Sequence, residues 1–276
     1  MQNVGVLSME SGDFQSIGLS PGQVQLGFSY NRSQLEIKML NYAPVDTGIV
    51  IQTLLMSAGL GLTDRLSLWT QIPRIQTSEK ANWEFGDPAF GFRWSPISTM
   101  ISKRLSVFMN EGFVLPVRRT KTSEDWQSGT VNSVKSQGVY LNRFVAELWF
   151  LSQTQRTFGT QLLWDFALNE NSDGFNPGRV FQLTVHTLDY QFSKPGIVPY
   201  LALSYRNKRT DRFEDNIVAN SAGWFVQGVV ALDVRISPTE HLTFSISAPL
   251  IIGIEGTQLK QVNFGLTLRS TSTSAR

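Results

Sequence analysis

The 276-residue sequence predicts an all-β fold, a transmembrane antiparallel up-and-down β-barrel of about twelve strands. Three observations lead to this prediction. Apolar residues alternate with small or polar ones along most of the chain, as in 262–268, and a period of two is typical of strands with one apolar face. Most such segments are ~9–14 residues long, enough to cross a bilayer. The connections between them alternate between short and long, as in outer-membrane barrels.

Turn residues separate the twelve expected strands. The strands span residues 23–31, 49–62, 66–76, 88–95, 104–117, 138–152, 157–169, 179–192, 197–210, 224–237, 242–254 and 261–269. Residues 34–39 also alternate, and we interpret them as an external extension of the first hairpin because an odd strand count is unusual in a bacterial barrel. No apolar run reaches the ~18 residues that a transmembrane helix needs.

The loop lengths predict the orientation in the membrane. The short connections fall at 63–65, 95–103, 154–156, 193–196 and 238–241. The long connections fall at 32–48, 77–87, 118–137, 170–178, 211–223 and 255–260. Because outer-membrane barrels have short periplasmic turns and long external loops, we expect both termini on the periplasmic side.

Mid-strand charges indicate which face meets lipid. Arg143 and Glu147 share one face of 138–152, and large apolar residues occupy the other. In a membrane barrel the apolar face contacts lipid and the charges line the lumen, whereas in a soluble barrel the charges face bulk water. We favour the membrane barrel because these apolar faces are too rich in aromatic residues for a narrow interior. Aromatic residues at strand ends fit interfacial girdles. They are Tyr30, Trp69, Trp94, Tyr205 and Trp224.

Composition excludes several functions. The 24 Lys and Arg against 22 Asp and Glu give a net charge of +2, too balanced for a nucleic-acid binder. The absence of cysteine excludes disulfides and thiolate metal sites, and two histidines cannot supply a multi-histidine metal site. We therefore expect neither metal nor cofactor. The start at Met1 lacks the features of a signal peptide, so we expect a mature form without its signal peptide, in the outer membrane of a Gram-negative bacterium.

Three regions are expected. Residues 1–22 are a periplasmic lead or a plug inside the lumen, 23–269 form a single transmembrane barrel, and 270–276 are a polar tail.

The candidate site is a set of charged and polar residues on the predicted lumenal faces. They are Arg93, Arg143, Glu147, Asp165, His186, Arg206, Asp233 and Arg235, with Lys208 and Arg269 on the same faces. Seven of these ten can be positive if His186 is protonated, which predicts a mildly anion-favouring or neutral-solute lumen. A constriction is expected at Arg143, Glu147, Asp165, Asp233 and Arg235. In the alternative, these charges pair with one another and fill a narrow interior. His241 is expected in a turn.

Three stretches carry a family resemblance: 59–73, 85–94 and 247–259. Their hairpin "GLTDRLSLWTQIP", the "GD" before a strand and the "GTQL" before the last strand resemble outer-membrane β-barrels of the phenol meta-degradation pathway transporter type. The resemblance implies an outer-membrane barrel that passes small, apolar or aromatic compounds. It carries over no catalytic residues.

Three functions are compared. The first is a monomeric, porin-like channel or transporter for small solutes. The second is a non-conducting scaffold barrel that holds a protein partner. The third, an outer-membrane enzyme, is disfavoured because neither His186 nor His241 stands in the His-x-Ser arrangement of an outer-membrane phospholipase. The expected partners are outer-membrane lipid and lipopolysaccharide and a small-molecule solute, but no nucleic acid.

Overall fold

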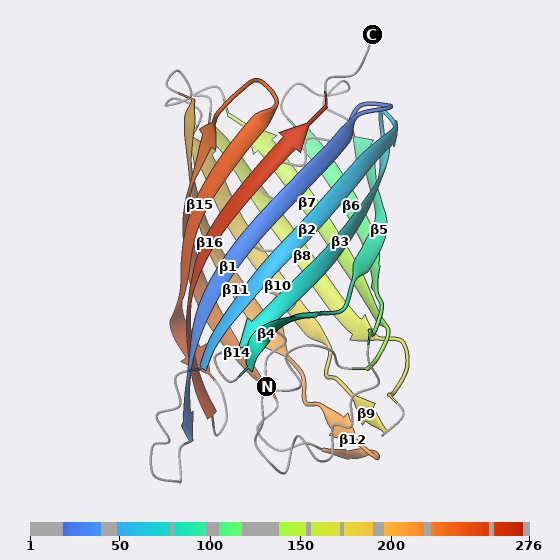
Figure 1. Cartoon of the computed structure of the whole chain (residues 1–276), viewed down its shortest axis with the longest axis vertical. Coiled ribbons are helices and arrows are strands. Elements are labelled where there is room, and N and C mark those ends of the chain that lie inside the picture. The colour runs from blue at the N-terminus through green and yellow to red at the C-terminus, as the bar shows by residue number, and fades with distance from the viewer. Residues whose placement is uncertain are drawn as a thin grey trace.

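The computed structural model describes residues 19–39, 49–77, 80–97, 105–117, 138–152, 156–171, 174–189, 196–217, 222–253 and 257–272. Every regular element within these ranges is a β-strand. Among the described residues, no helix is long and apolar enough to cross a membrane. Twelve long, tilted antiparallel strands form a closed barrel (Figure 1).

Each predicted strand corresponds to one barrel strand. The barrel strands are β1 (Val24–Met39), β2 (Ile49–Thr63), β3 (Leu66–Thr77), β5 (Ala89–Ile97), β6 (Leu105–Val114), β7 (Leu141–Leu151), β8 (Arg156–Ala167), β10 (Val180–Asp189), β11 (Ile197–Lys208), β14 (Gly223–Arg235), β15 (Glu240–Gly253) and β16 (Thr257–Thr271). Strands that follow one another in this order pair antiparallel, and β1 also pairs with β16, from Gln25 opposite Thr271 to Met39 opposite Thr257. This pairing closes the barrel and leaves no open edge.

The first hairpin and the last strand are longer than the predicted strands. β1 continues to Met39 because its outer part pairs with the start of β16, with Lys38 opposite Gln258. Residues 34–39 are thus a continuation of the first strand, as expected, although the pairing with β2 ends at Leu35 and only β16 pairs with the rest. Their external position stays a prediction. The loops predicted at 32–48 and 255–260 include residues that belong to strands. β16 likewise runs two residues past the predicted end at 269.

Short extra strands occupy three of the predicted loops. β4 (Lys80–Phe85) pairs with β3. β9 (Phe175–Asn176), β12 (Arg212–Phe213) and β13 (Asn216–Ile217) form a separate three-stranded sheet. Glu214 and Asp215 make the turn of the β12–β13 hairpin with φ angles of 47° and 62°, the left-handed conformation that a two-residue hairpin turn requires. The sequence did not predict β9, β12 and β13, because strands of two residues are too short to show alternation.

The outer wall of the barrel is apolar and the inner wall is largely polar. Along β14, Val230 and Leu232 are about half exposed, at 53% and 46%, whereas Gln227 and Asp233 are buried. β7 repeats the pattern, with Leu148 exposed and Glu147 buried. A water-soluble barrel shows the opposite order, so the predicted assignment of the two faces to lipid and lumen agrees with the structure.

The start of the first barrel strand and the end of the last lie at the same end of the barrel. The amide of Ser272 donates to the carbonyl of Val24 at 2.8 Å, and the amide of Thr271 donates to the carbonyl of Thr239 at 2.9 Å. Thr239 lies in the short β14–β15 connection, so this is the end with the short turns. In Figure 1 it is at the top, and β9 and β12 mark the opposite end at the bottom. Residues 1–18 and 273–276 lie outside the described residues, and the predicted roles of 1–22 and 270–276 stay predictions.

The predicted topology can be tested by labelling. A cysteine at Asn216, in the β12–β13 hairpin, should react with a membrane-impermeant thiol reagent on whole cells. Ser128, in the predicted external loop 118–137 that lies outside the described residues, should react as well. Thr239→Cys is the control and should stay unlabelled until the outer membrane is permeabilised. If only Thr239→Cys were labelled on intact cells, the orientation in the membrane would be the opposite of the predicted one.

The assignment of faces predicts position-dependent stability. Leu148→Arg or Leu232→Arg should lower the free energy of unfolding by ~2–4 kcal/mol if these outer-wall sites lie near the bilayer midplane. Ser245→Arg is the matched control, because Ser245 is a half-buried inner-wall residue paired with Gly265, and its cost should be much smaller. Urea unfolding in lipid vesicles measures both. Equal losses at the two sets of sites would contradict the assignment.

Candidate lumenal site

The inner wall holds almost all of the predicted site residues. Seven of the eight have exposed fractions of only 2–8%. They are Arg93, Arg143, Glu147, Asp165, His186, Arg206 and Asp233. Arg235 differs because it is exposed at the end of β14, where its Nε donates to the carbonyl of Ser237 at 3.3 Å. The structure therefore does not bring Arg235 together with the other charges of the expected constriction.

Arg143 and Asp165 form a two-pronged ion pair in the half of the barrel nearer the long loops. They are direct partners in the β7–β8 register. Arg143 Nε donates to Asp165 Oδ1 and Nη2 donates to Oδ2, both at 2.7 Å. Such parallel contacts are the strongest arrangement of a guanidinium and a carboxylate, and each charge compensates the burial of the other.

Glu147 is the centre of a second cluster, about midway along the barrel. Arg93 Nη2 lies 3.3 Å from Glu147 Oε2, although the two come from β5 and β7 with β6 between them. The side chain of Phe108 on β6 lies beneath this link, with its ring centroid 4.0 Å from the Arg93 guanidinium carbon. Glu147 also accepts hydrogen bonds from Asn110 at 2.9 Å and from Trp149 Nε1 at 3.0 Å. The carboxylate is thus held by three donors.

Asp233 gathers a third cluster near the short-turn end. Its carboxylate is 2.9 Å from Arg269 Nη2 and 2.8 Å from His241 Nδ1, and it accepts from Thr243 Oγ1 at 2.6 Å. The prediction that His241 is a turn residue is wrong, since it is the second residue of β15 and on the same face as Thr243. The sequence signal for this placement was the spacing of two residues between His241 and Thr243, which puts both side chains on one face of a strand.

The end of β11 nearer the long loops carries two further buried cations. Arg206 is 3% exposed. Lys208 Nζ lies 2.7 Å from Asp211 Oδ2, and Asp211 is 1% exposed. Buried charge on the inner wall is therefore largely paired, as in the alternative in which the charges brace a narrow interior.

His186 packs between aromatic rings. Its ring centroid is 4.2 Å from that of Trp149 and 5.8 Å from that of Tyr200. Gly159, its direct partner on β8, leaves the space that the imidazole fills, because any side chain there would overlap the ring. Nε2 is buried with no hydrogen-bond partner among the described residues.

An apolar wall adjoins His186 on the inner side of β10, β11 and β14. Its core consists of Leu188, Val198, Tyr200, Val229 and Ala231, with Trp149 and Ala202 packed against it. The sequence prediction of a polar lumen missed this wall. A signal was present, because 197–203 and 229–232 are apolar on both faces and their alternation lapses.

Trp69 also lies on the inner side, against the expectation that it belongs to an interfacial girdle. It pairs with Gly91 of β5, and its ring covers both Gly91 and Gly112, where side chains would overlap it. The other predicted girdle residues are on the outer face. They are Tyr30, Trp94, Tyr205 and Trp224.

These features define a class of protein: a twelve-stranded membrane-type β-barrel with a lipid-facing apolar exterior and an interior that combines paired charges with apolar surfaces. No group of three or more potential metal-ligating residues occurs in the described part of the chain.

Comparisons with known proteins agree with this class. The COG4313 outer membrane channel from Pseudomonas putida F1 superimposes with a TM-score of 0.72 at 12% identity, covering 95% of this chain and 98% of that one. The NanC porin gives 0.54 at 9% identity over 88% and 100% of the two chains. The CymD monoaromatic hydrocarbon channel gives 0.51 at 9% identity over 100% and 95%. No family model and no curated protein sequence matches the chain.

At these identities the likeness is one of fold: the chain has the fold of outer-membrane channels. The more specific resemblance to transporters of the phenol meta-degradation pathway stays a prediction.

The Arg143–Asp165 pair predicts a non-additive mutant cycle. Arg143→Ala should cost about 3–5 kcal/mol of unfolding free energy, because it leaves a buried carboxylate without its counter-charge. The double variant Arg143→Ala/Asp165→Ala should cost less than the sum of the two single variants. Unfolding in lipid vesicles measures all three. Additive losses would show that the two side chains do not stabilise each other.

Proposed function

We propose that the chain is an outer-membrane channel for small solutes, with small aromatic compounds as its preferred class. The observation that carries this proposal is the inner wall, where the rings of Trp149, His186 and Tyr200 join an apolar surface. The apolar outer face and the fold shared with outer-membrane channels support the membrane location.

The chemistry of the inner wall suits an amphipathic solute. An aromatic ring gains by contact with other rings and with aliphatic side chains. Next to the apolar wall, β15, β16 and β1 present hydroxyl and amide groups inward, among them Thr243, Thr267 and Asn31. A phenol-like solute can place its ring on one side and its hydroxyl on the other. A neighbour of the same fold is described as a monoaromatic hydrocarbon channel, which agrees with this choice.

The paired charges favour neutral over strongly anionic solutes. Arg143, Arg93 and Arg269 each face a carboxylate, so the positive surplus counted along the sequence is largely compensated locally. In a barrel of eight strands the side chains fill the interior, whereas sixteen or more strands leave an open channel. A barrel of twelve strands lies between these two cases. We therefore infer a narrow, near-neutral passage. The same pairing also favours the second candidate, a scaffold barrel that conducts nothing.

Solute entry tests the aromatic preference. Proteoliposomes should admit a small phenol faster than a neutral sugar of similar mass. Trp149→Ala/Tyr200→Ala should slow the phenol by up to about tenfold, since each aromatic contact is worth ~0.5–1.5 kcal/mol, and should leave the sugar unchanged. Trp164→Ala is the matched control, because Trp164 is 45% exposed on the outer face. Equal slowing of both solutes would remove the aromatic preference.

Conductance tests the channel itself. In planar bilayers Arg143→Ala should raise the single-channel current and shift ion preference towards cations, because it frees the negative charge of Asp165. Arg235→Ala serves as the control, since Arg235 is exposed at the end of β14. If the wild-type protein and both variants are silent, and no solute enters liposomes, the channel proposal fails and the scaffold takes its place.

A further inference from the structure

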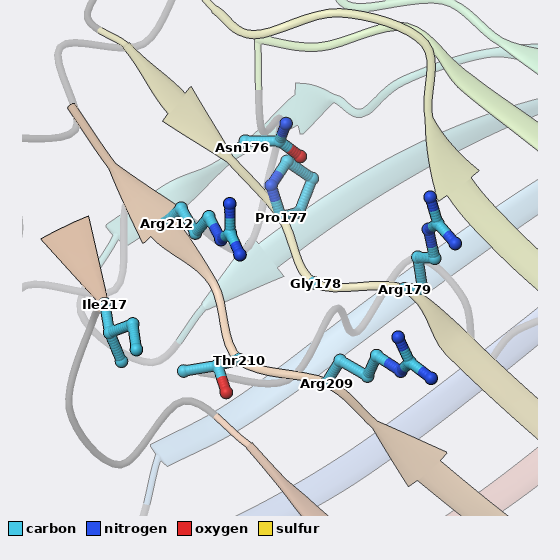
Figure 2. Close-up of a pocket in the computed structure, with 8 residues that line it drawn as sticks. All are labelled: Asn176, Pro177, Gly178, Arg179, Arg209, Thr210, Arg212 and Ile217. Atoms are coloured by element: carbon cyan, nitrogen blue, oxygen red, sulfur yellow. The ribbon is translucent and has the colours of Figure 1, made fainter. Parts of the chain in front are cut away.

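A basic pocket lies at the long-loop end of the barrel, outside the lumenal site. Its volume is about 370 Å³, and it is lined by Asn176, Pro177, Gly178, Arg179, Arg209, Thr210, Arg212 and Ile217. Figure 2 shows Arg179 and Arg209 on neighbouring segments at one end, with Arg212 and Ile217 at the other. We call it the arginine pocket.

Arg179 and Arg209 project from the outer wall of the barrel. The amide of Arg209 donates to the carbonyl of Arg179 at 2.9 Å, which extends the β10–β11 ladder one step beyond the pair Val180 and Lys208. Val180 and Lys208 are buried on the inner wall, and successive side chains alternate, so both arginines belong to the outer wall. Both are exposed. Gly178 permits this junction, because a side chain there would overlap the backbone of Arg209.

Among the described residues, no carboxylate forms an ion pair with the arginines of the pocket. Asp211 is buried and is not among the lining residues; its carboxylate lies 2.7 Å from Lys208 Nζ and accepts from the Gly178 amide at 2.7 Å. Glu214 and Asp215 are exposed at the tip of the β12–β13 hairpin. Within the part of the chain that the structure describes, Arg179, Arg209 and Arg212 have no ion pair to a carboxylate. Three arginines thus line one pocket.

An aromatic belt lies immediately below the pocket on the outer wall. Phe181, Tyr205 and Trp224 are 37–38% exposed, and the last two rings are 6.2 Å apart. Asn207, which lies between Tyr205 and Arg209 in the chain, donates a hydrogen bond of 3.2 Å to the Tyr205 hydroxyl. Aromatic rings with polar tips mark the border between hydrocarbon and headgroups. The arginine pocket therefore lies at the level of the lipid headgroups.

We propose that the arginine pocket binds the phosphorylated sugar headgroup of lipid A in lipopolysaccharide. This inference rests on the proposed outer-membrane location, in which the long-loop end faces the lipopolysaccharide leaflet. Arginine holds phosphate through paired, planar hydrogen bonds, and Thr210 and Asn176 add neutral polar groups suited to a sugar. The exposed belt below provides the surface for the acyl chains. Binding therefore combines charge and apolar contact at one site on the barrel wall.

Binding can be measured with the full refolded chain in detergent. Native mass spectrometry would count bound lipid A, using bisphosphorylated lipid A, its dephosphorylated form and inorganic phosphate as separate probes. The variant is Arg179→Gln/Arg209→Gln. The matched control is Arg65→Gln/Arg235→Gln, which removes two exposed arginines at the opposite end of the barrel. Heat-modified gel mobility checks that each variant is folded, and single-channel current in lipid A-free bilayers is recorded in parallel.

The wild type and the control should bind bisphosphorylated lipid A alike, and the pocket variant should bind it roughly tenfold or more weakly. Dephosphorylated lipid A should bind all three equally weakly. Arg179→Lys/Arg209→Lys should restore only part of the affinity, because an ammonium cannot form the paired contact. Equal lipid A binding by the wild type and the pocket variant would overturn the proposal. So would competition by inorganic phosphate at equal concentration, which would indicate a site for free anions. Because current is measured without lipid A, loss of conductance tests the channel proposal alone.

Discussion

The structure depends on one constraint: in lipid, every backbone amide and carbonyl must find its partner within the protein. The chain meets it by pairing its first barrel strand with its last, from Gln25 opposite Thr271 to Met39 opposite Thr257. Successive side chains of a strand point to opposite faces, so in a closed barrel they alternate between lipid and interior. The outer wall must then be apolar, and whatever lies between the apolar residues must pack inside. The character of the interior follows from this forced alternation.

A confined interior makes charge costly unless it is paired, and the inner wall shows how the chain meets that cost. Arg143 faces Asp165 in direct register, whereas Arg93 reaches Glu147 across a whole strand. The second link needs Phe108 beneath the guanidinium and Asn110 beside the carboxylate. Such clusters tie neighbouring strands together in addition to the backbone ladder. They also explain why a chain with many lumenal arginines need not present a strongly positive passage.

The sequence predicted the fold well because alternation is a direct record of which face each residue occupies. It placed all twelve barrel strands and the extension of 34–39. It failed where distance along the chain hides contact in space. Arg269 completes the Asp233 cluster from β16, two strands away, and Trp69 lies inside because Gly91 and Gly112, on two other strands, leave room for it. No sequence pattern singled out Glu111, which shares the outer face with Phe144 and accepts from Asn142 at 3.2 Å.

One sector of the barrel departs from a purely polar interior and also carries basic and aromatic groups on its outer wall. β10, β11 and β14 carry the apolar inner wall, and the outer faces of the same three strands carry the aromatic belt below the arginine pocket. On the opposite side of β14, the inner wall of β15, β16 and β1 keeps a regular network of hydroxyls and amides, such as Thr267 donating to Ser29 at 2.9 Å. Regular alternation is sufficient to build a closed barrel. A sector that is apolar on its inner wall, and basic on the outer wall at its long-loop end, exceeds that requirement. Because an apolar lumenal surface gives up polar contacts that β15, β16 and β1 retain, its position beside His186 supports the proposed contact with an apolar solute.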